Sequence, residues 1–232
     1  MTGFQQVALL LAALWLLLVA VRFRRSAAVL AGGLIVIGLL TLAAFLLHRV
    51  AAVQLGLGPA GPWWRTPVFA LAGLALMLAC SPLADRIAGH WFPQPPSLEA
   101  FAPIRRSWVN LAAGILAAWV LGGVLEELVA RGIVLQAVET GLRPWLAGPA
   151  AAGTAVCLAA AGAGLMHTYQ GPRAVVVIAQ LSVLFGVLFV VSGYDLWAVM
   201  LCHGLYDTIA FVRYAAGKSR YSQPDTDRAS QE

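Results

Sequence analysis

Three charged side chains lie close together in a part of the chain that is otherwise almost wholly apolar. Glu126 and Glu127 are followed by Arg131 in residues 124–132, which read VLEELVARG. An ionisable side chain at membrane depth costs about 2.5–3.5 kcal/mol on insertion scales, so such groups are kept where they serve a purpose. A carboxylate shielded from water takes up a proton more readily than one in solution, which suits it to acid–base catalysis near neutral pH. The cluster therefore predicts proton-transfer chemistry.

Two histidines in later apolar segments extend the list of candidate groups. His167 ends one segment, just before a Gly-Pro turn, and His203 precedes Asp207 by four residues in another. Imidazole is the side chain most often used as a general acid or base, and it can also orient a water molecule. Glu126, His167, His203 and Asp207 are therefore the candidate catalytic residues.

Helical spacing separates the roles within the first cluster. Residues four apart lie on one face of an α-helix, so Glu127 is expected to pair with Arg131, and His203 with Asp207. Glu126 is rotated away from that face and points into a different environment. We assign Glu127 and Arg131 a structural role, as an intrahelical ion pair that keeps both charges tolerable.

Each histidine also has a purely structural interpretation. A lone buried His167 with satisfied hydrogen bonds would be ordinary, and a hydrogen bond between His203 and Asp207 would require no function. Charged or titratable groups on three separate helices of one small membrane protein make coincidence the weaker explanation.

Helix lengths place two of these sites at a similar depth. Glu126 lies about 18 residues before the turn near Pro144, and His167 about 22 residues after it, which antiparallel helices with a rise of about 1.5 Å per residue bring level. His203, about nine residues from the opposite turn at Gly193, joins them only if His167 sits inside the membrane.

Composition sets the class of protein that must position these groups. Hydrophobic residues make up 61% of the 232 positions, charged residues only 11%, and the mean hydropathy is +0.83. These values exclude a soluble domain. The chain also lacks the alternating segments of about ten residues that a membrane barrel requires.

The long apolar windows predict an all-α fold, a polytopic helical membrane bundle of seven to eight transmembrane helices. Seven is the central count, and the segment from Arg131 to Leu142 extends the fourth window and could be scored as an eighth. Gly122 and Gly123 offer a place for that helix to bend. The seven windows cover residues 4–22, 27–47, 67–84, 107–125, 145–167, 173–192 and 195–215.

The polar connections between the apolar windows predict that the chain is divided into three parts. Residues 1–106 form an N-terminal membrane scaffold of about three helices, residues 107–215 a catalytic core, and residues 216–232 a disordered polar tail. The connections 48–66 and 85–106 are glycine- and proline-rich and are expected to be interfacial loops. Trp63 and Trp64 are expected to anchor one of them at the membrane boundary.

The net charge of +5 is a topology signal and does not indicate nucleic-acid binding, because the basic residues are scattered among loops. By the positive-inside rule they predict a cytoplasmic C-terminus. Cys80, Cys157 and Cys202 are isolated within apolar windows and lack the spacing of a disulfide or metal site. We expect them to be small buried hydrophobic side chains. The basic residues that set this orientation are Arg22, Arg24, Arg25, Arg86, Arg105, Arg106, Arg213, Lys218, Arg220 and Arg228.

Residues 107–212 resemble the CAAX prenyl protease type II group, also called the Abi or CPBP family of intramembrane proteases. The family's Glu-Glu-x-x-x-Arg, Phe-x-x-x-His and His-x-x-x-Asn/Asp motifs occur here in the family's order, on successive apolar segments. The chain departs from the family at Ala163, where an aromatic residue is expected, and at Ala130, where many relatives have phenylalanine. The matching residues are Glu126, Glu127, Arg131, Gly132, His167, His203 and Asp207.

The resemblance implies hydrolysis of a peptide bond in a water-filled cavity of the bundle. Glu126 and His167 would activate a water molecule, and His203 would donate to the oxyanion. Asp207 stands where relatives with asparagine have a donor, and an ionised aspartate cannot donate, so we expect it to orient His203. The implied partners are the lipid bilayer and a membrane-anchored or transmembrane protein or peptide substrate, which need not be prenylated.

Two alternatives remain open at this point. Glu126, His167, His203 and Asp207 are plausible zinc ligands, although the His-Glu-x-x-His signature is absent, and we favour catalysis without a metal cofactor. The second alternative is that the protein is a catalytically inactive relative that acts in binding or bacteriocin immunity. Proton-coupled transport is disfavoured, since no internal repeat is apparent. Composition and compact loops suggest a prokaryotic cytoplasmic (inner) membrane.

Overall fold

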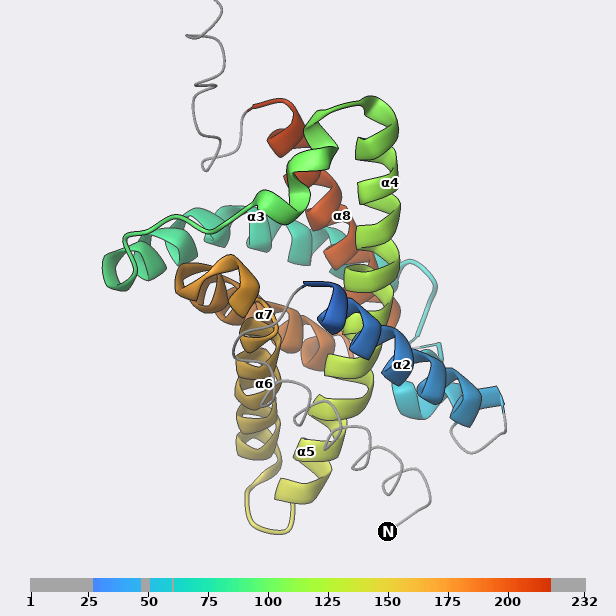
Figure 1. The fold of residues 1–232 in the computed structure, drawn as a ribbon. Helices are drawn as coiled ribbons and strands as arrows, with labels where there is room; N and C mark the ends of the chain where they lie inside the picture. Colours follow the sequence, from blue (N-terminus) through green and yellow to red (C-terminus); the bar gives the residue numbers. More distant parts are fainter. Residues whose placement is uncertain (1–26, 47–50, 60, 218–232) are drawn as a thin grey trace, which may run out of the picture.

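The structure is a computed structural model that describes residues 27–46, 51–59 and 61–217. Within these ranges every regular element is a helix, which confirms the all-α prediction (Figure 1). The predicted first span and almost all of the predicted polar tail lie outside the described residues. The longer elements are α2 (Ala27–Leu46), α3 (Arg65–Trp91), α4 (Trp108–Ala118), η3 (Trp119–Glu126), η4 (Leu128–Leu135), α5 (Gln136–Leu142), α6 (Gly148–Leu165), α7 (Pro172–Val191) and α8 (Leu196–Ala215).

Four helical segments of the described chain are long and apolar enough to cross a membrane. They are Arg65–Trp91, Trp108–Leu142, Gly148–Leu165 and Pro172–Val191. The helices α2 and α8 coincide with two further predicted windows. The protein is therefore an integral membrane protein, while the predicted count of seven to eight spans stays a prediction.

The third helix is longer than its apolar window predicts. It continues from the expected end near residue 84 to Trp91, so the connection to α4 begins only at residue 92. The extension carries Asp85, whose carboxylate receives two hydrogen bonds from the guanidinium of Arg173 on α7, at 2.8 and 2.9 Å. The expected loop from residue 85 is thus wrong for residues 85–91, and the contact with Arg173 makes the charge of Asp85 acceptable in the helix.

The elements α4, η3, η4 and α5 form one continuous helical segment, Trp108–Leu142, as the sequence predicted. Residues 119–126 and 128–135 in its middle are π-helical. Gly122 and Gly123, the expected bend, lie in this wider part. Runs of π-helix are rare and occur mostly at functional sites, and these two carry Glu126 and Arg131 of the Glu-Glu-x-x-x-Arg motif, with Glu127 between them.

Small residues let η3 approach α8 closely. A Cβ atom placed on Gly204 of α8 would lie 2.5 Å from the ring of Trp119, and one on Gly123 would lie 3.4 Å from the backbone of Gly204. The indole N–H of Trp119 donates to the hydroxyl of Thr208, 3.0 Å away. This crossing fixes η3 against α8, the two elements that carry the glutamates and the last histidine.

The remaining helices surround this pair. The helix α7 packs against α6 and α3, α3 packs against α8, and α2 packs against η3 and η4 (Figure 1). Side-chain caps define two helix starts, because Ser107 accepts from the N–H of Asn110 and Asp195 from the N–H of Ala198, each at 3.2 Å. The ends of α6, α7 and α8 lie within three residues of the predicted windows.

The first predicted interfacial loop also contributes to the core. Leu55, in the short 3-10 helix η1 (Ala52–Leu55), is 2% exposed, and the carbonyl of Gly56 accepts from the N–H of Leu196 at the start of α8. Gly56 has φ +79°, and a Cβ there would lie 2.5 Å from the carbonyl oxygen of Tyr194. Trp63 and Trp64 remain exposed, as expected of interfacial residues.

Candidate active site

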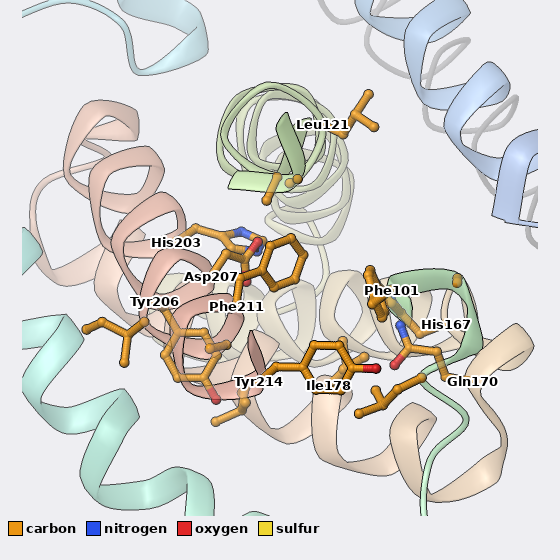
Figure 2. A pocket seen from close by; sticks show the side chains of 18 of the residues that line it. Phe101, Leu121, His167, Gln170, Ile178, His203, Tyr206, Asp207, Phe211 and Tyr214 are labelled. Atoms are coloured by element: carbon orange, nitrogen blue, oxygen red, sulfur yellow. The ribbon is translucent and has the colours of Figure 1, made fainter. Parts of the chain in front are cut away.

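A cavity of about 970 Å³ opens among α3, α4, η3, α7 and α8 (Figure 2). Its lining includes all four candidate catalytic residues, which come from three different parts of the chain. They are Glu126, His167, His203 and Asp207. The structure is thus consistent with the prediction that these groups lie close together. His203, which the helix lengths placed there only on a condition, also lines the cavity.

The two adjacent glutamates point in different directions. Glu126, at the end of η3, lines the cavity and is 8% exposed. Glu127 is fully buried at 0% exposure and does not line the cavity. The expected separation of the two side chains is therefore present, and Glu126 is the one that a molecule in the cavity can reach.

Glu127 binds two partners through one carboxylate oxygen. Its Oε1 accepts from Nη1 of Arg131 at 3.0 Å, which is the predicted ion pair, and from Nδ1 of His203 at 2.6 Å. Arg131, 1% exposed, also donates from Nη2 to the backbone carbonyl and the hydroxyl of Ser182 on α7. Glu127 and Arg131 therefore join η3, η4, α7 and α8 in one buried network.

A phenylalanine completes the network from the side. The ring of Phe185 stacks on the imidazole of His203, with centroids 4.7 Å apart and planes at 24°. The guanidinium carbon of Arg131 lies 5.4 Å from the centroid of the same ring. Phe185 thus contacts both partners of Glu127, and a cation over an aromatic face is an attractive contact of about 0.5–2 kcal/mol.

Two carboxylates lie beside the imidazole of His203, and the predicted partner Asp207 is the more distant one. Asp207 Oδ2 lies 3.5 Å from Nε2 of His203, whereas Glu127 Oε1 lies 2.6 Å from Nδ1. Glu127 is the closer and fully buried partner of the ring, whereas Asp207 faces the cavity at 24% exposure, so its orienting role stays a prediction. A Cβ on Gly122 would lie 3.0 Å from Asp207 Oδ2, so this glycine leaves the space that the aspartate occupies.

The tautomer of His167 follows from its backbone contact. Its Nδ1 lies 2.9 Å from the carbonyl oxygen of Ala163, and because a carbonyl only accepts, Nδ1 carries the proton. The other nitrogen, Nε2, is then an acceptor in the neutral ring. His167 follows α6 and lies across the cavity from His203 and Asp207 in the view of Figure 2.

The positions of the possible zinc ligands bear on the alternative of a metal centre. Among the residues that the structure describes, no three His, Cys, Asp or Glu side chains converge on a point that could hold a metal ion. The four residues named as possible zinc ligands share the cavity wall without forming such a group.

Several cavity and network residues escaped the sequence reasoning. Ser182 and Phe185 hold Arg131 and His203, and Phe101 and Tyr169 line the cavity near His167. Ser182 gave a weak signal, as one of few polar residues in an apolar window. The aromatic residues gave none, because aromatic side chains are common throughout membrane helices and their connections.

The fold and the cavity together define a helical integral membrane protein whose helices enclose a cavity lined by carboxylate and imidazole side chains. Residues 108–209 match the family model of the type II CAAX prenyl endopeptidases, Rce1-like. The match confirms the resemblance drawn from the motifs and supports a protease. The matched range contains all four candidate catalytic residues. Comparison with curated proteins and with solved structures gave no match.

Proposed function

We propose that this protein is an intramembrane endopeptidase that hydrolyses a peptide bond of a membrane-anchored or transmembrane protein or peptide. The observation that carries the proposal is that Glu126 and His167 line one cavity of about 970 Å³. That volume is in the range of pockets that enclose sizeable ligands, so an extended peptide segment and a water molecule fit together. The family match over the same residues supports the reaction class.

Glu126 acts as the general base of the proposed reaction. It takes a proton from a water molecule while the water oxygen attacks the scissile carbonyl carbon, and Nε2 of His167, an acceptor, orients the same water. The new oxyanion accepts a hydrogen bond from Nε2–H of protonated His203, whose Nδ1–H is held by Glu127. Glu126 then returns the proton to the leaving nitrogen, the C–N bond breaks, and an acid and an amine are released.

The remaining charges position these groups. Arg131 and Glu127 fix the imidazole of His203 from behind, and Asp207 balances the charge of the protonated ring. Catalysis proceeds without a metal cofactor in this proposal, and the partners are the lipid bilayer and the peptide substrate, with no nucleic acid. The setting we propose is a prokaryotic cytoplasmic (inner) membrane, with the C-terminus in the cytoplasm.

The test is a comparison of protein termini in membranes from cells that carry wild-type protein or Glu126→Gln. Gln is isosteric but cannot accept the proton, and losing a general base lowers rates about 10²–10⁴-fold. We expect a set of new termini that depends on Glu126 and survives stringent chelation. Glu99→Gln is the matched control, because Glu99 is exposed and does not line the cavity.

Three results would contradict the proposal in different ways. Termini that persist in Glu126→Gln would remove Glu126 from the reaction. Cleavage lost on chelation and restored only by zinc would require a metalloprotease. A cellular phenotype that Glu126→Gln retains, without any change in termini, would favour an inactive relative that acts by binding, as in bacteriocin immunity.

A further inference from the structure

One wall of the cavity is formed by a segment that lies outside the matched range. Residues 93–107, here called the strap, connect α3 to α4 and include the 3-10 helix η2 (Glu99–Arg105). The strap precedes residue 108, where the family match begins. Five of its residues line the cavity: Leu98, Ala100, Phe101, Pro103 and Ile104.

Hydrogen bonds fix the strap at three points. The carbonyl of Pro93 accepts from Nη1 of Arg173 at 3.3 Å, and the carbonyl of Pro103 accepts from the side-chain amide of Asn110 at 3.0 Å. Between them, the N–H of Ser97 donates to the carbonyl of Gln170 at 2.9 Å. The strap therefore has a defined position relative to the cavity.

The central bond connects the strap to the histidine side of the site. Gln170 ends η5 (Thr168–Gln170), the single turn that directly follows His167. The strap is thereby held beside the backbone that positions the proposed water-orienting group. Ile104 is 7% exposed and packs on Gly114 of α4, where a Cβ would lie 2.9 Å from it. It closes the strap against α4.

Phe101 is the large strap side chain that remains available to a molecule in the cavity. It is only partly buried, lines the cavity, and contacts Phe211 of α8 with ring centroids 5.4 Å apart. In Figure 2 its ring lies on the same side of the cavity as His167. A substrate group next to the reacting carbonyl and on the His167 side would meet this ring.

We propose that Phe101 is a specificity-determining residue: its ring limits the size of the apolar substrate side chain that fits beside the bond to be cleaved. The proposal rests on the proposed protease function. Apolar pockets discriminate by about 10–200-fold for each methylene group that they admit or reject. Removing the ring should enlarge this part of the cavity and favour larger side chains.

The test uses acylated decapeptides reconstituted in lipid vesicles. The peptides are identical except for one position, scanned along the sequence and occupied by Ala, Leu, Phe or Trp. Wild type, Phe101→Leu and Phe101→Ala are compared by the ratio of kcat/KM for Trp-containing and Ala-containing peptides at each position. We expect Phe101→Ala to raise this ratio at least about tenfold at one position, with Phe101→Leu between it and wild type.

Phe92→Ala is the control, since Phe92 is an exposed phenylalanine immediately before the strap that does not line the cavity. It should leave the ratio unchanged. A purely structural Phe101 would lower cleavage of all peptides equally in Phe101→Ala. A ratio within twofold of wild type at every position would therefore overturn the proposal.

A binding measurement separates failure of this inference from failure of the protease function. The same peptides are titrated into Glu126→Gln and into Glu126→Gln combined with Phe101→Ala, and the rise in thermal unfolding temperature is recorded. If wild type cleaves no peptide, the protease proposal fails, and the binding measurement alone then tests whether Phe101 selects ligands by size. An unchanged size order in the double variant would then overturn the role of Phe101.

Discussion

At the scale of single residues, the shared oxygen of Glu127 is the central feature of the site. One Oε1 atom accepts from Arg131 and from His203, so one carboxylate supports an intrahelical contact and a contact between residues 76 positions apart. Glu126, the neighbouring residue of the same type, faces the cavity instead. Glu126 and Glu127 are therefore chemically identical neighbours in different environments, and mutating each one separately distinguishes their contributions.

Glu127→Gln is expected to destabilise the protein, whereas Glu126→Gln is expected to leave stability nearly unchanged. Removing one partner of a fully buried ion pair costs about 3–5 kcal/mol, because the Arg131 charge is left uncompensated. Thermal unfolding in detergent, followed by intrinsic tryptophan fluorescence, measures both variants. Equal unfolding temperatures for Glu127→Gln and wild type would show that Glu127 does not hold the network together.

The sequence predicted local contacts well at this scale and long-range ones poorly. The Glu127–Arg131 pair and the nearness of His203 to Asp207 follow from a spacing of four residues on a helix. The link from Glu127 to His203 was missed, because it depends on how η3 crosses α8. No spacing along the chain encodes that crossing, so the sequence predicted Asp207 as a partner of His203 but not Glu127.

At the scale of elements, the crossing of η3 and α8 determines the geometry of the site. Gly204, Gly123 and the ring of Trp119 form the contact surface, and the hydrogen bond to Thr208 sets its register. Close helix approach at small residues is common in membranes, where packing replaces the hydrophobic effect as the driving force. The boundaries of α6, α7 and α8 were predictable from hydrophobic windows, since lipid demands continuous apolar length. The extension of α3 was not, because the charge of Asp85 is compensated by another helix.

Gly204→Ala is expected to destabilise the protein by about 1–3 kcal/mol, because the new methyl group would lie 2.5 Å from the Trp119 ring. Activity should fall as well, since η3 and α8 carry Glu126 and His203. Gly153→Ala is the matched control: it lies on the exposed face of α6, nothing lies within 4 Å of its Cβ position, and alanine favours a helix. Unfolding temperatures that fall equally in both variants would contradict close packing at the crossing.

At the scale of the whole molecule, exposed tryptophans lie near both ends of the long Trp108–Leu142 segment. Trp108 and Trp145 lie at opposite ends of the Trp108–Leu142 segment and are 81% and 82% exposed. Tryptophan favours the headgroup region. Arg105 and Arg106 lie beside Trp108, and the end of α8 joins them, because Arg105 lies over the ring of Tyr214. In the orientation that we propose from the positive-inside rule, this end faces the cytoplasm.

Cysteines introduced at these two tryptophans are expected to label from opposite sides of the membrane. In a chain whose three native cysteines are replaced by alanine, Trp145→Cys should react with a membrane-impermeant maleimide in intact cells. Trp108→Cys should react only after permeabilisation. The cysteine-free chain is the control, and the reverse labelling pattern would invert the proposed orientation.

The position of the strap in the chain has a consequence for how such a protein can change over time. The strap supplies a cavity wall from residues 93–107, while the buried ion pairs and histidines lie in residues 108–209. Substitutions of the cavity-lining residues in this short connection change the shape of the cavity, whereas the fully buried charged residues of the described chain belong to the matched range. For the function that we propose, substrate range could therefore diverge between lineages, or be redesigned, through this connection while the proposed catalytic residues stay the same.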